Sequence, residues 1–217
     1  MKLFLSILMG YLLGSISPSY FISKKKNIDL RKKGTGNLGA TNTFMILGKA
    51  YGAFVMFFDI FKAYLAVRLA VLFFPNLVIA GIAAGGASVI GHNYPFYLKF
   101  KGGKGIAAFA GFILALNWKY FLILLVVCLI IAIISNYSCM LSISAAILFP
   151  FMTMADIFRH REAVETSLII IATVILIITS ASIIYKHTDN LKKIASGEEI
   201  KFRTFLSRYI LSSKKDK

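Results

Sequence analysis

The chain has 217 residues, of which 58% are hydrophobic, and its mean hydropathy is +0.76. Soluble domains are about 45–50% apolar, so this composition excludes an ordinary soluble protein and indicates a membrane protein solvated mostly by lipid. The formal net charge of +16 suits anionic headgroups, nucleic acid or small anions. Nucleic-acid binding usually requires a soluble fold with a basic face, so we expect no nucleic acid among the partners.

Seven apolar blocks predict seven transmembrane helices. They cover residues 3–21, 51–74, 77–90, 106–116, 120–134, 140–154 and 168–184. Crossing a hydrocarbon core about 30 Å thick takes about 20 helical residues, so the third, fourth and sixth blocks are short and must borrow flanking residues or cross a thinner patch. We interpret the first block as a retained helix and not as a cleaved signal peptide. The predicted fold is an all-α integral membrane protein, a single polytopic domain over residues 1–217.

The distribution of lysine and arginine predicts the orientation of this bundle. Cytoplasmic loops carry an excess of these residues. With seven spans, one face receives nineteen of them and the other receives four, which are Lys2, Lys119, Arg159 and Arg161. We therefore place the N-terminus outside and the C-terminus in the cytoplasm, where a short basic tail over residues 192–217 suits anionic headgroups.

Two charges within the second block predict an ion pair. Charged side chains inside a span are costly and are usually paired or functional. Asp59 and Lys62 are three residues apart, so they share a helix face and can neutralise each other inside the bundle.

Two loops on the predicted cytoplasmic face combine glycines with cations. The first covers residues 24–42 and the second covers residues 91–105. Glycines let backbone N–H groups approach an anion closely, and lysines supply the opposing charge, so both loops are predicted to hold phosphate. Gly102, Gly103 and Lys104 would also lie at a helix N-terminus, where the helix dipole favours an anion. The alternative is a flexible basic turn attracted to headgroups.

A third polar stretch follows the last span. His187 and Asn190 are three residues apart, so on a continuing helix they face the same way and can hydrogen-bond one ligand. A surface histidine is the alternative. Cys128 and Cys139 form no C-x-x-C pair, and the sequence has no metal-ligand cluster, so we expect neither a metal nor a cofactor.

In this order, these stretches resemble the acyl-phosphate-dependent glycerol-3-phosphate acyltransferases, the PlsY family, over nearly the whole chain. The matching runs are Gly-Ser-Ile-Ser-Pro-Ser-Tyr at 14–20, Gly-Thr-Gly-Asn-Leu-Gly-Ala-Thr-Asn at 34–42, Gly-His-Asn-Tyr-Pro at 91–95 and Lys-Phe-Lys-Gly-Gly-Lys-Gly at 99–105. The resemblance implies transfer of a fatty acyl group from acyl phosphate to the 1-hydroxyl of sn-glycerol 3-phosphate, which gives lysophosphatidate and phosphate and is the first acylation of phospholipid synthesis. It also implies the bacterial cytoplasmic membrane, with membrane lipids and a soluble acyl-phosphate-producing enzyme as further partners.

The resemblance also implies roles for individual residues. Lys104, His187 and Asn190 occupy catalytic positions. Lys104 would neutralise phosphate charge, and His187 would orient the acceptor or take its proton, with the departing phosphate as the alternative base. The implied substrate-binding positions are Thr35, Gly36, Asn37, Asn42, Gly102, Gly103 and Ser142, and the implied structural positions are Asp59, Lys62 and Glu199.

Three positions depart from the family pattern. Met45 and Asn136 stand where the family has arginine, and Cys139 stands where it has serine. Loss of two cations near phosphate sites would weaken acceptor binding or mark a diverged paralogue with another acceptor, or a catalytically silent scaffold. A transporter of an anionic metabolite is the remaining alternative, although transporters usually bind substrate near the midplane between repeats and the sequence shows no convincing repeat.

Overall fold

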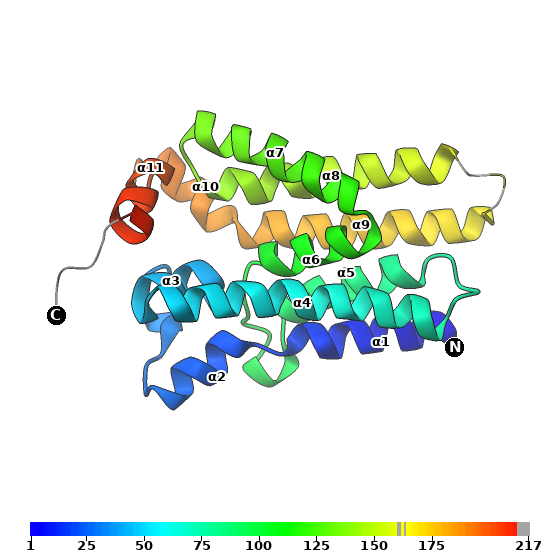
Figure 1. Ribbon diagram of the computed structural model, residues 1–217, viewed down its shortest axis with the longest axis horizontal. Coiled ribbons are helices and arrows are strands. Elements are labelled where there is room, and N and C mark those ends of the chain that lie inside the picture. The colour runs from blue at the N-terminus through cyan, green and yellow to red at the C-terminus, as the bar shows by residue number, and fades with distance from the viewer. Residues whose placement is uncertain (160–161, 163, 212–217) are drawn as a thin grey trace.

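The computed structural model describes residues 1–159, 162 and 164–211, which form helices joined by loops (Figure 1). Within this part of the chain the β-structure is limited to one isolated bridge between Tyr137 and Lys201. Arg161, which belongs to the predicted outer face, and residues 212–217 of the predicted basic tail lie outside the described residues. The all-α prediction is confirmed for the part that is described.

The helices coincide with the predicted apolar blocks, with one break. The first block forms α1 (Lys2–Ser15) and α2 (Pro18–Lys25) because Pro18 begins a new helix and holds Ser17 in an extended conformation. The other blocks form α4 (Lys49–Phe73), α5 (Ala80–Asn93), α6 (Ile106–Leu116), α7 (Trp118–Ser135), α8 (Cys139–Arg159) and α9 (Thr166–Lys186). Shorter helices are α3 (Ala40–Leu47), α10 (Thr188–Ala195) and α11 (Phe202–Phe205), with 3₁₀ turns at Leu30–Lys32 and Phe96–Leu98 and a π-helical turn at Leu206–Leu211.

Four helical stretches of the described chain are long and apolar enough to cross a bilayer: Lys2–Lys25, Trp118–Ser135, Cys139–Arg159 and Thr166–Lys186. α4 has 25 residues but carries charges along its length, and α5 and α6 have only 14 and 11 residues. Large apolar side chains such as Phe57 (70% exposed) and Ile134 (79% exposed) cover the outside of the bundle. This surface is suited to lipid, so the chain is an integral membrane protein.

α5 is the central helix of the bundle. All of its residues except Ile90 are buried, and it packs against α1, α4, α6 and α9. Gly10 and Gly14 of α1 lie directly against the backbone at Ala84 and Ser88, where a Cβ would overlap it. Small residues at such contacts let helices associate closely in a bilayer. The polar C-terminal end of α5 is thereby held deep inside the bundle.

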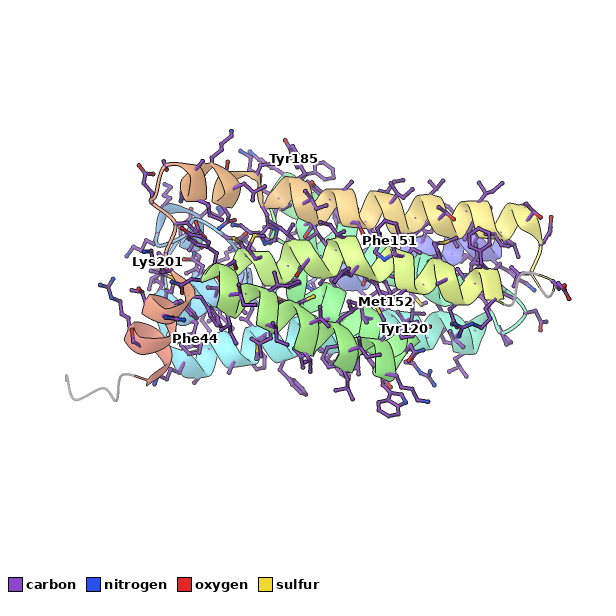
Figure 2. All side chains as sticks on the ribbon, turned by 90° about the horizontal axis from the view of Figure 1, so that it is seen from above. Phe44, Tyr120, Phe151, Met152, Tyr185 and Lys201 are labelled. Atoms are coloured by element: carbon purple, nitrogen blue, oxygen red, sulfur yellow. The ribbon has the colours of Figure 1, made fainter. Side chains whose placement is uncertain are left out.

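One end of the molecule gathers both glycine loops and the C-terminal helices, and we call it the loop end. In Figure 1 it holds α2, α3, α10 and α11, while the N-terminus lies at the opposite end. Figure 2 likewise places Phe44 of α3 and Lys201 together at this end. Leu30 and Leu38 of the first glycine loop share a buried apolar cluster with Leu98 of the second. The two loops are therefore neighbours on one side of the bundle.

Candidate active site

A chain of polar side chains at the loop end is centred on Lys104. The Lys104 ammonium donates to Oδ1 of Asn190, and Nδ2 of Asn190 donates to Oε1 of Glu199 at 2.7 Å. Lys104 precedes α6, Asn190 lies on α10, and Glu199 follows α10, so three separate segments meet here. Burial lowers the pKa of Lys104, while the Glu199 carboxylate acts in the opposite direction and favours the charged form.

His187 lies at the junction of α9 and α10 and is only 4% exposed. Its Nδ1 is 2.8 Å from the backbone carbonyl of Ile183. A carbonyl only accepts hydrogen bonds, so we assign the ring hydrogen to Nδ1, which leaves Nε2 with a lone pair. Burial lowers the pKa of His187 to about 4. At neutral pH the ring is therefore uncharged and its Nε2 can accept a hydrogen bond.

Asn42 organises the first glycine loop. Its Oδ1 accepts from the N–H of Thr35 at 2.8 Å, and its Nδ2 donates to the carbonyls of Leu30, Lys33 and Asn37 at 2.8–3.1 Å. The side chain is 1% exposed. Asn42 thus cross-links the first loop from inside, and its expected substrate-binding role stays a prediction.

Three backbone amides of the glycine loops are also used internally. The N–H of Gly102 donates to the Asn93 carbonyl at 3.1 Å, and that of Gly103 donates to the His92 carbonyl at 3.0 Å. In the first loop the N–H of Gly36, a residue with φ +70°, donates to Lys33 at 3.0 Å. These three amide hydrogens already bond to backbone carbonyls, and phosphate binding by the two loops stays a prediction.

Gly102 and Gly103 of the second loop also have a steric role. A Cβ on Gly103 would overlap the His92 ring, and a Cβ on Gly102 would meet the His92 carbonyl and the ring of Pro95. The chain can fold back against the end of α5 only because these side chains are absent. This close packing places Lys104 over the buried end of α5.

The predicted ion pair forms and includes a third residue. Nζ of Lys62 is 2.6 Å from Oδ1 of Asp59 and 3.1 Å from Nδ1 of His92, and it also donates to the carbonyl of Ile16 at 2.6 Å. Asp59 and Lys62 are 1% and 2% exposed. The carbonyl of Ile16 is free to accept because Pro18 interrupts the helix there. The pair therefore holds the α1–α2 break, α4 and α5 together beneath the second loop.

The remaining predicted residues fall into two groups. Thr35 and Gly36 are exposed and Asn37 is half-buried, all on the first loop. Ser142 is buried on α8, one turn after Cys139, and Cys139 lies in the neighbourhood of Lys104. The structure thus brings Lys104, Asn190 and Glu199 into contact with one another, whereas the first-loop residues form a separate group at the same end.

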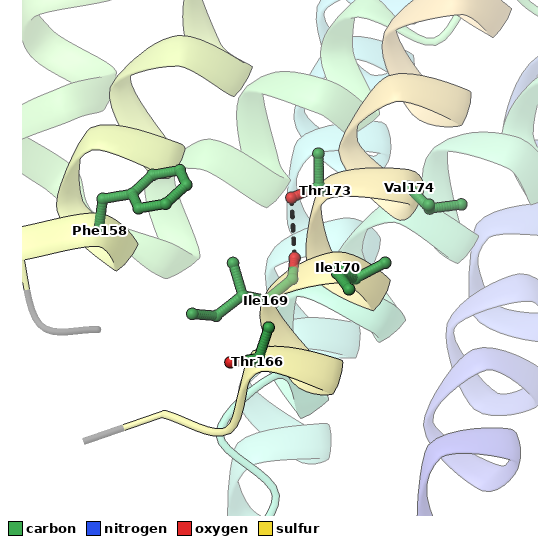
Figure 3. Close-up of a pocket in the computed structure, with 6 residues that line it drawn as sticks. All are labelled: Phe158, Thr166, Ile169, Ile170, Thr173 and Val174. Carbon is green, nitrogen blue, oxygen red and sulfur yellow. Dashed lines mark hydrogen bonds between the residues drawn. The ribbon is translucent and has the colours of Figure 1, made fainter. Parts of the chain in front are cut away.

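A groove elsewhere on the surface contains none of the predicted site residues. Its walls are formed by α8 and α9 near their junction, as Figure 3 shows, and the lining residues are Phe158, Thr166, Ile169, Ile170, Thr173 and Val174. The Thr173 hydroxyl donates to the Ile169 carbonyl at 2.8 Å. The groove is apolar and offers no charged group for a phosphate.

Comparison with known proteins identifies the family. The family model described as glycerol-3-phosphate acyltransferase matches residues 4–197. The chain belongs to the glycerol-3-phosphate acyltransferase family. It is 39% identical over 204 residues to the glycerol-3-phosphate acyltransferase of Macrococcus caseolyticus, covering 94% of this chain and 98% of that protein. It is 36% identical over 202 residues to that of Aquifex aeolicus, covering 93% and 100%.

Two solved structures of the family share the fold. The crystal structure of PlsY (YgiH), an integral membrane glycerol 3-phosphate acyltransferase, in its glycerol 3-phosphate form matches with a TM-score of 0.77 and 34% identity over 93% of this chain and 96% of that one. Its lysophosphatidic acid form matches with a TM-score of 0.76 and 32% identity over 96% and 100%. The sequence-based resemblance to this acyltransferase family is confirmed.

Four residues near the Lys104 chain, His92, Asn93, Tyr94 and Lys186, were not predicted as site residues. His92 contacts the Lys62 ammonium, and Nδ2 of Asn93 donates to the Ser182 hydroxyl at 2.7 Å. The Lys186 ammonium lies 4.4 Å from the ring centre of Tyr94 and within electrostatic range of Lys104. The signal was available, because His92, Asn93 and Tyr94 belong to one of the runs that carried the resemblance, but the run alone assigns them no contacts.

The departures from the family pattern lie close to the loop end. Asn136 ends α7 in a left-handed conformation with φ +60°. Met45 lies on α3 next to Phe44, and the centre of the Phe44 ring is 6.4 Å from that of Phe205. Cys139 is buried and begins α8. Asn136 and the α3 region are thus where the C-terminal segment meets the rest of the acyltransferase fold.

Proposed function

We propose that the chain transfers a fatty acyl group from acyl phosphate to the 1-hydroxyl of sn-glycerol 3-phosphate, giving 1-acyl-sn-glycerol 3-phosphate and inorganic phosphate. The observation that carries this proposal is the Lys104–Asn190–Glu199 chain beside the neutral His187, in a chain that belongs to this acyltransferase family. A cation held by an amide and a carboxylate suits a phosphate that gains charge as its bond to the acyl group breaks.

The chemistry follows from the states of these groups. The hydroxyl oxygen of the acceptor attacks the acyl carbonyl carbon, a C–O bond forms, and the bond between that carbon and the phosphate oxygen breaks. An acyl phosphate is a mixed anhydride with a good leaving group, so positioning and charge stabilisation supply most of the catalysis. Lys104 would stabilise the charge that develops on the departing phosphate, and the residues of the first loop, Thr35 and Asn37, would contact phosphate oxygens through their side chains.

The low pKa of His187 distinguishes between two possible roles, orienting the acceptor hydroxyl and taking its proton. Nε2 of the neutral ring can accept the hydroxyl hydrogen of the acceptor and so orient its oxygen toward the acyl carbon. Because the pKa is about 4, a protonated His187 would pass its proton on to the departing phosphate, which is the stronger base. We therefore assign His187 the orienting role and the phosphate the role of final proton acceptor.

The same proposal includes the topology and the setting. Seven spans in one polytopic domain, with the N-terminus outside and the C-terminus in the cytoplasm, would place the loop end and its excess of lysine and arginine on the cytoplasmic side. Glycerol 3-phosphate and acyl phosphate would reach the site there, the acyl chain remaining in the bilayer. The setting would be the bacterial cytoplasmic membrane, and a soluble enzyme that produces acyl phosphate would be the partner that delivers the donor.

Purified protein in lipid vesicles tests this function. With acyl phosphate supplied, phosphate should be released only when glycerol 3-phosphate is added, and mass spectrometry should detect the monoacyl product. A parallel panel with glycerol and dihydroxyacetone phosphate tests whether Met45 and Asn136 mark a different acceptor. Release without any acceptor, or uptake of glycerol 3-phosphate into the vesicles without conversion, would contradict the proposal.

A further inference from the structure

The segment 198–205 docks on the turn between α7 and α8. The N–H of Phe202 donates to the backbone carbonyl of Asn136 at 2.7 Å, and the N–H of Arg203 donates to Oδ1 of the same residue at 3.1 Å. The bridge between Tyr137 and Lys201 lies directly beside these bonds. Asn136 thus satisfies the first two N–H groups of α11, which have no partner within that helix. We call this pair of bonds the Asn136 clamp.

The conformation of Asn136 suits this task. It has φ +60° and ψ 26°, a left-handed conformation that asparagine adopts more readily than most residues. Ending α7 in this way turns both the carbonyl and the side-chain oxygen of Asn136 toward α11. The rings of Phe44 and Phe205, whose centres are 6.4 Å apart, attach α11 to α3 as well.

The clamp lies three residues from the Lys104 chain. Glu199, which holds Asn190, precedes Lys201 and Phe202. On its other side the N–H groups of Glu198 and Glu199 both donate to the carbonyl of Lys193, at 2.8 and 3.1 Å. Glu199 therefore sits on a short tether that is fixed to α10 at one end and to Asn136 at the other.

We propose that Asn136 is a positioning residue for acyl transfer: by holding Phe202 and Arg203 it keeps Glu199 on Asn190, and thereby keeps the Lys104 ammonium aligned. The inference rests on the proposed function for what the alignment of Lys104 achieves. The family model ends at residue 197, so the clamp holds a stretch of chain beyond the matched region. Small displacements of a charge-stabilising group reduce catalysis strongly even when binding persists.

A matched pair of substitutions at Phe202 isolates one bond of the clamp. Phe202→Pro removes the N–H that donates to Asn136, and proline fits the first position of a helix. Lys201 has φ −63° and ψ 141°, the extended conformation that the residue before proline requires. Phe202→Ala removes the ring and keeps the N–H, so it serves as the control. At the other partner, Asn136→Gly keeps the left-handed backbone and the carbonyl and removes only the side-chain acceptor.

In full-length protein in lipid, Phe202→Pro and Asn136→Gly should each lower kcat about tenfold while KM for glycerol 3-phosphate changes less than about twofold. The alkaline limb of the pH–rate profile should move to lower pH, because a displaced Glu199 no longer favours charged Lys104. Phe202→Ala should stay within about twofold of the native kcat. Amide hydrogen exchange over residues 198–205 should be faster in the two clamp variants than in the control.

Each possible outcome supports or overturns the positioning role of Asn136. Faster exchange with unchanged kcat and pH profile would show that the segment is held without positioning Lys104, and this would overturn the inference. Unchanged exchange would show that the clamp does not hold the segment, which overturns it equally. Absence of turnover in the native chain would overturn the proposed function and this role together, whereas native turnover with unaffected variants would overturn this role alone.

Discussion

Exchanging the hydrogen-bonding groups of Asn190 and Glu199 tests whether their bond aligns Lys104. Asn190→Asp keeps the oxygen that accepts from Lys104 but replaces the Nδ2 donor with a second oxygen facing Oε1 of Glu199. The 2.7 Å bond is lost and two carboxylates face each other. Adding Glu199→Gln to this variant restores a donor–acceptor pair with reversed direction and returns the net charge to the native value.

The size of the effect follows from the kind of bond. A hydrogen bond to an ionised group contributes about 1.5–3 kcal/mol, which corresponds to about 10- to 150-fold in rate. Glu199 is half-buried, so we expect the lower part of this range, about 10- to 30-fold in kcat/KM for Asn190→Asp. The double variant should recover to within about threefold of the native enzyme.

The assay is the initial rate of phosphate release from acyl phosphate at varied glycerol 3-phosphate, with protein in lipid. Asp189→Asn is the matched control, because it removes an exposed carboxylate that also acts on Lys104 and leaves the Asn190 bond in place. It should change kcat/KM less than about threefold. If the double variant is as slow as the product of the two single losses, Asn190 and Glu199 act independently and the alignment argument is wrong.

Three further predictions use the same site and the buried ion pair. Glu199→Gln should move the alkaline limb of the pH–rate profile to lower pH, because the carboxylate favours charged Lys104; a limb that stays in place would contradict this coupling. The imidazole of His187, assigned by loss of its signal in His187→Gln, should titrate near pH 4 by NMR; a midpoint near 6.5 would refute the neutral-acceptor role. Lys62→Met should destabilise the protein by about 3–5 kcal/mol because it removes the cation from the buried Asp59 carboxylate and leaves it with the His92 ring at 3.3 Å. Adding Asp59→Leu should recover most of this loss in thermal unfolding measured in detergent, and no recovery would argue against the pair.

Hydropathy predicted the helices well because burial in lipid demands long apolar segments. The ends of α4, α6 and α7 fall within two residues of the predicted blocks. The break at Pro18 was missed because the surrounding residues remain apolar enough to continue the block. Its consequence, a free Ile16 carbonyl that accepts from Lys62, depends on the packing of α1 against α4 and could not be derived from the local sequence.

The sequence named several residues of the candidate site but did not predict the hydrogen bonds between them. Lys104, His187 and Asn190 were found from their spacing and from the family resemblance, and the structure brings Lys104 and Asn190 into contact. The use of the Gly102 and Gly103 amides by α5 carbonyls was not foreseeable, because it requires knowing that the loop folds back on the helix that precedes it. Contacts such as Arg203 to Asn136, 67 residues apart, leave no periodic signal in the sequence.

The most direct test of the proposed mechanism is a charge removal at Lys104 that keeps the side-chain volume. In Lys104→Met the ammonium is lost, and the proposed mechanism predicts that glycerol-3-phosphate-dependent phosphate release falls at least about a hundredfold, with the folded protein eluting from size exclusion as the native one does. Phosphate release at the native rate from folded Lys104→Met would contradict the central role of this cation.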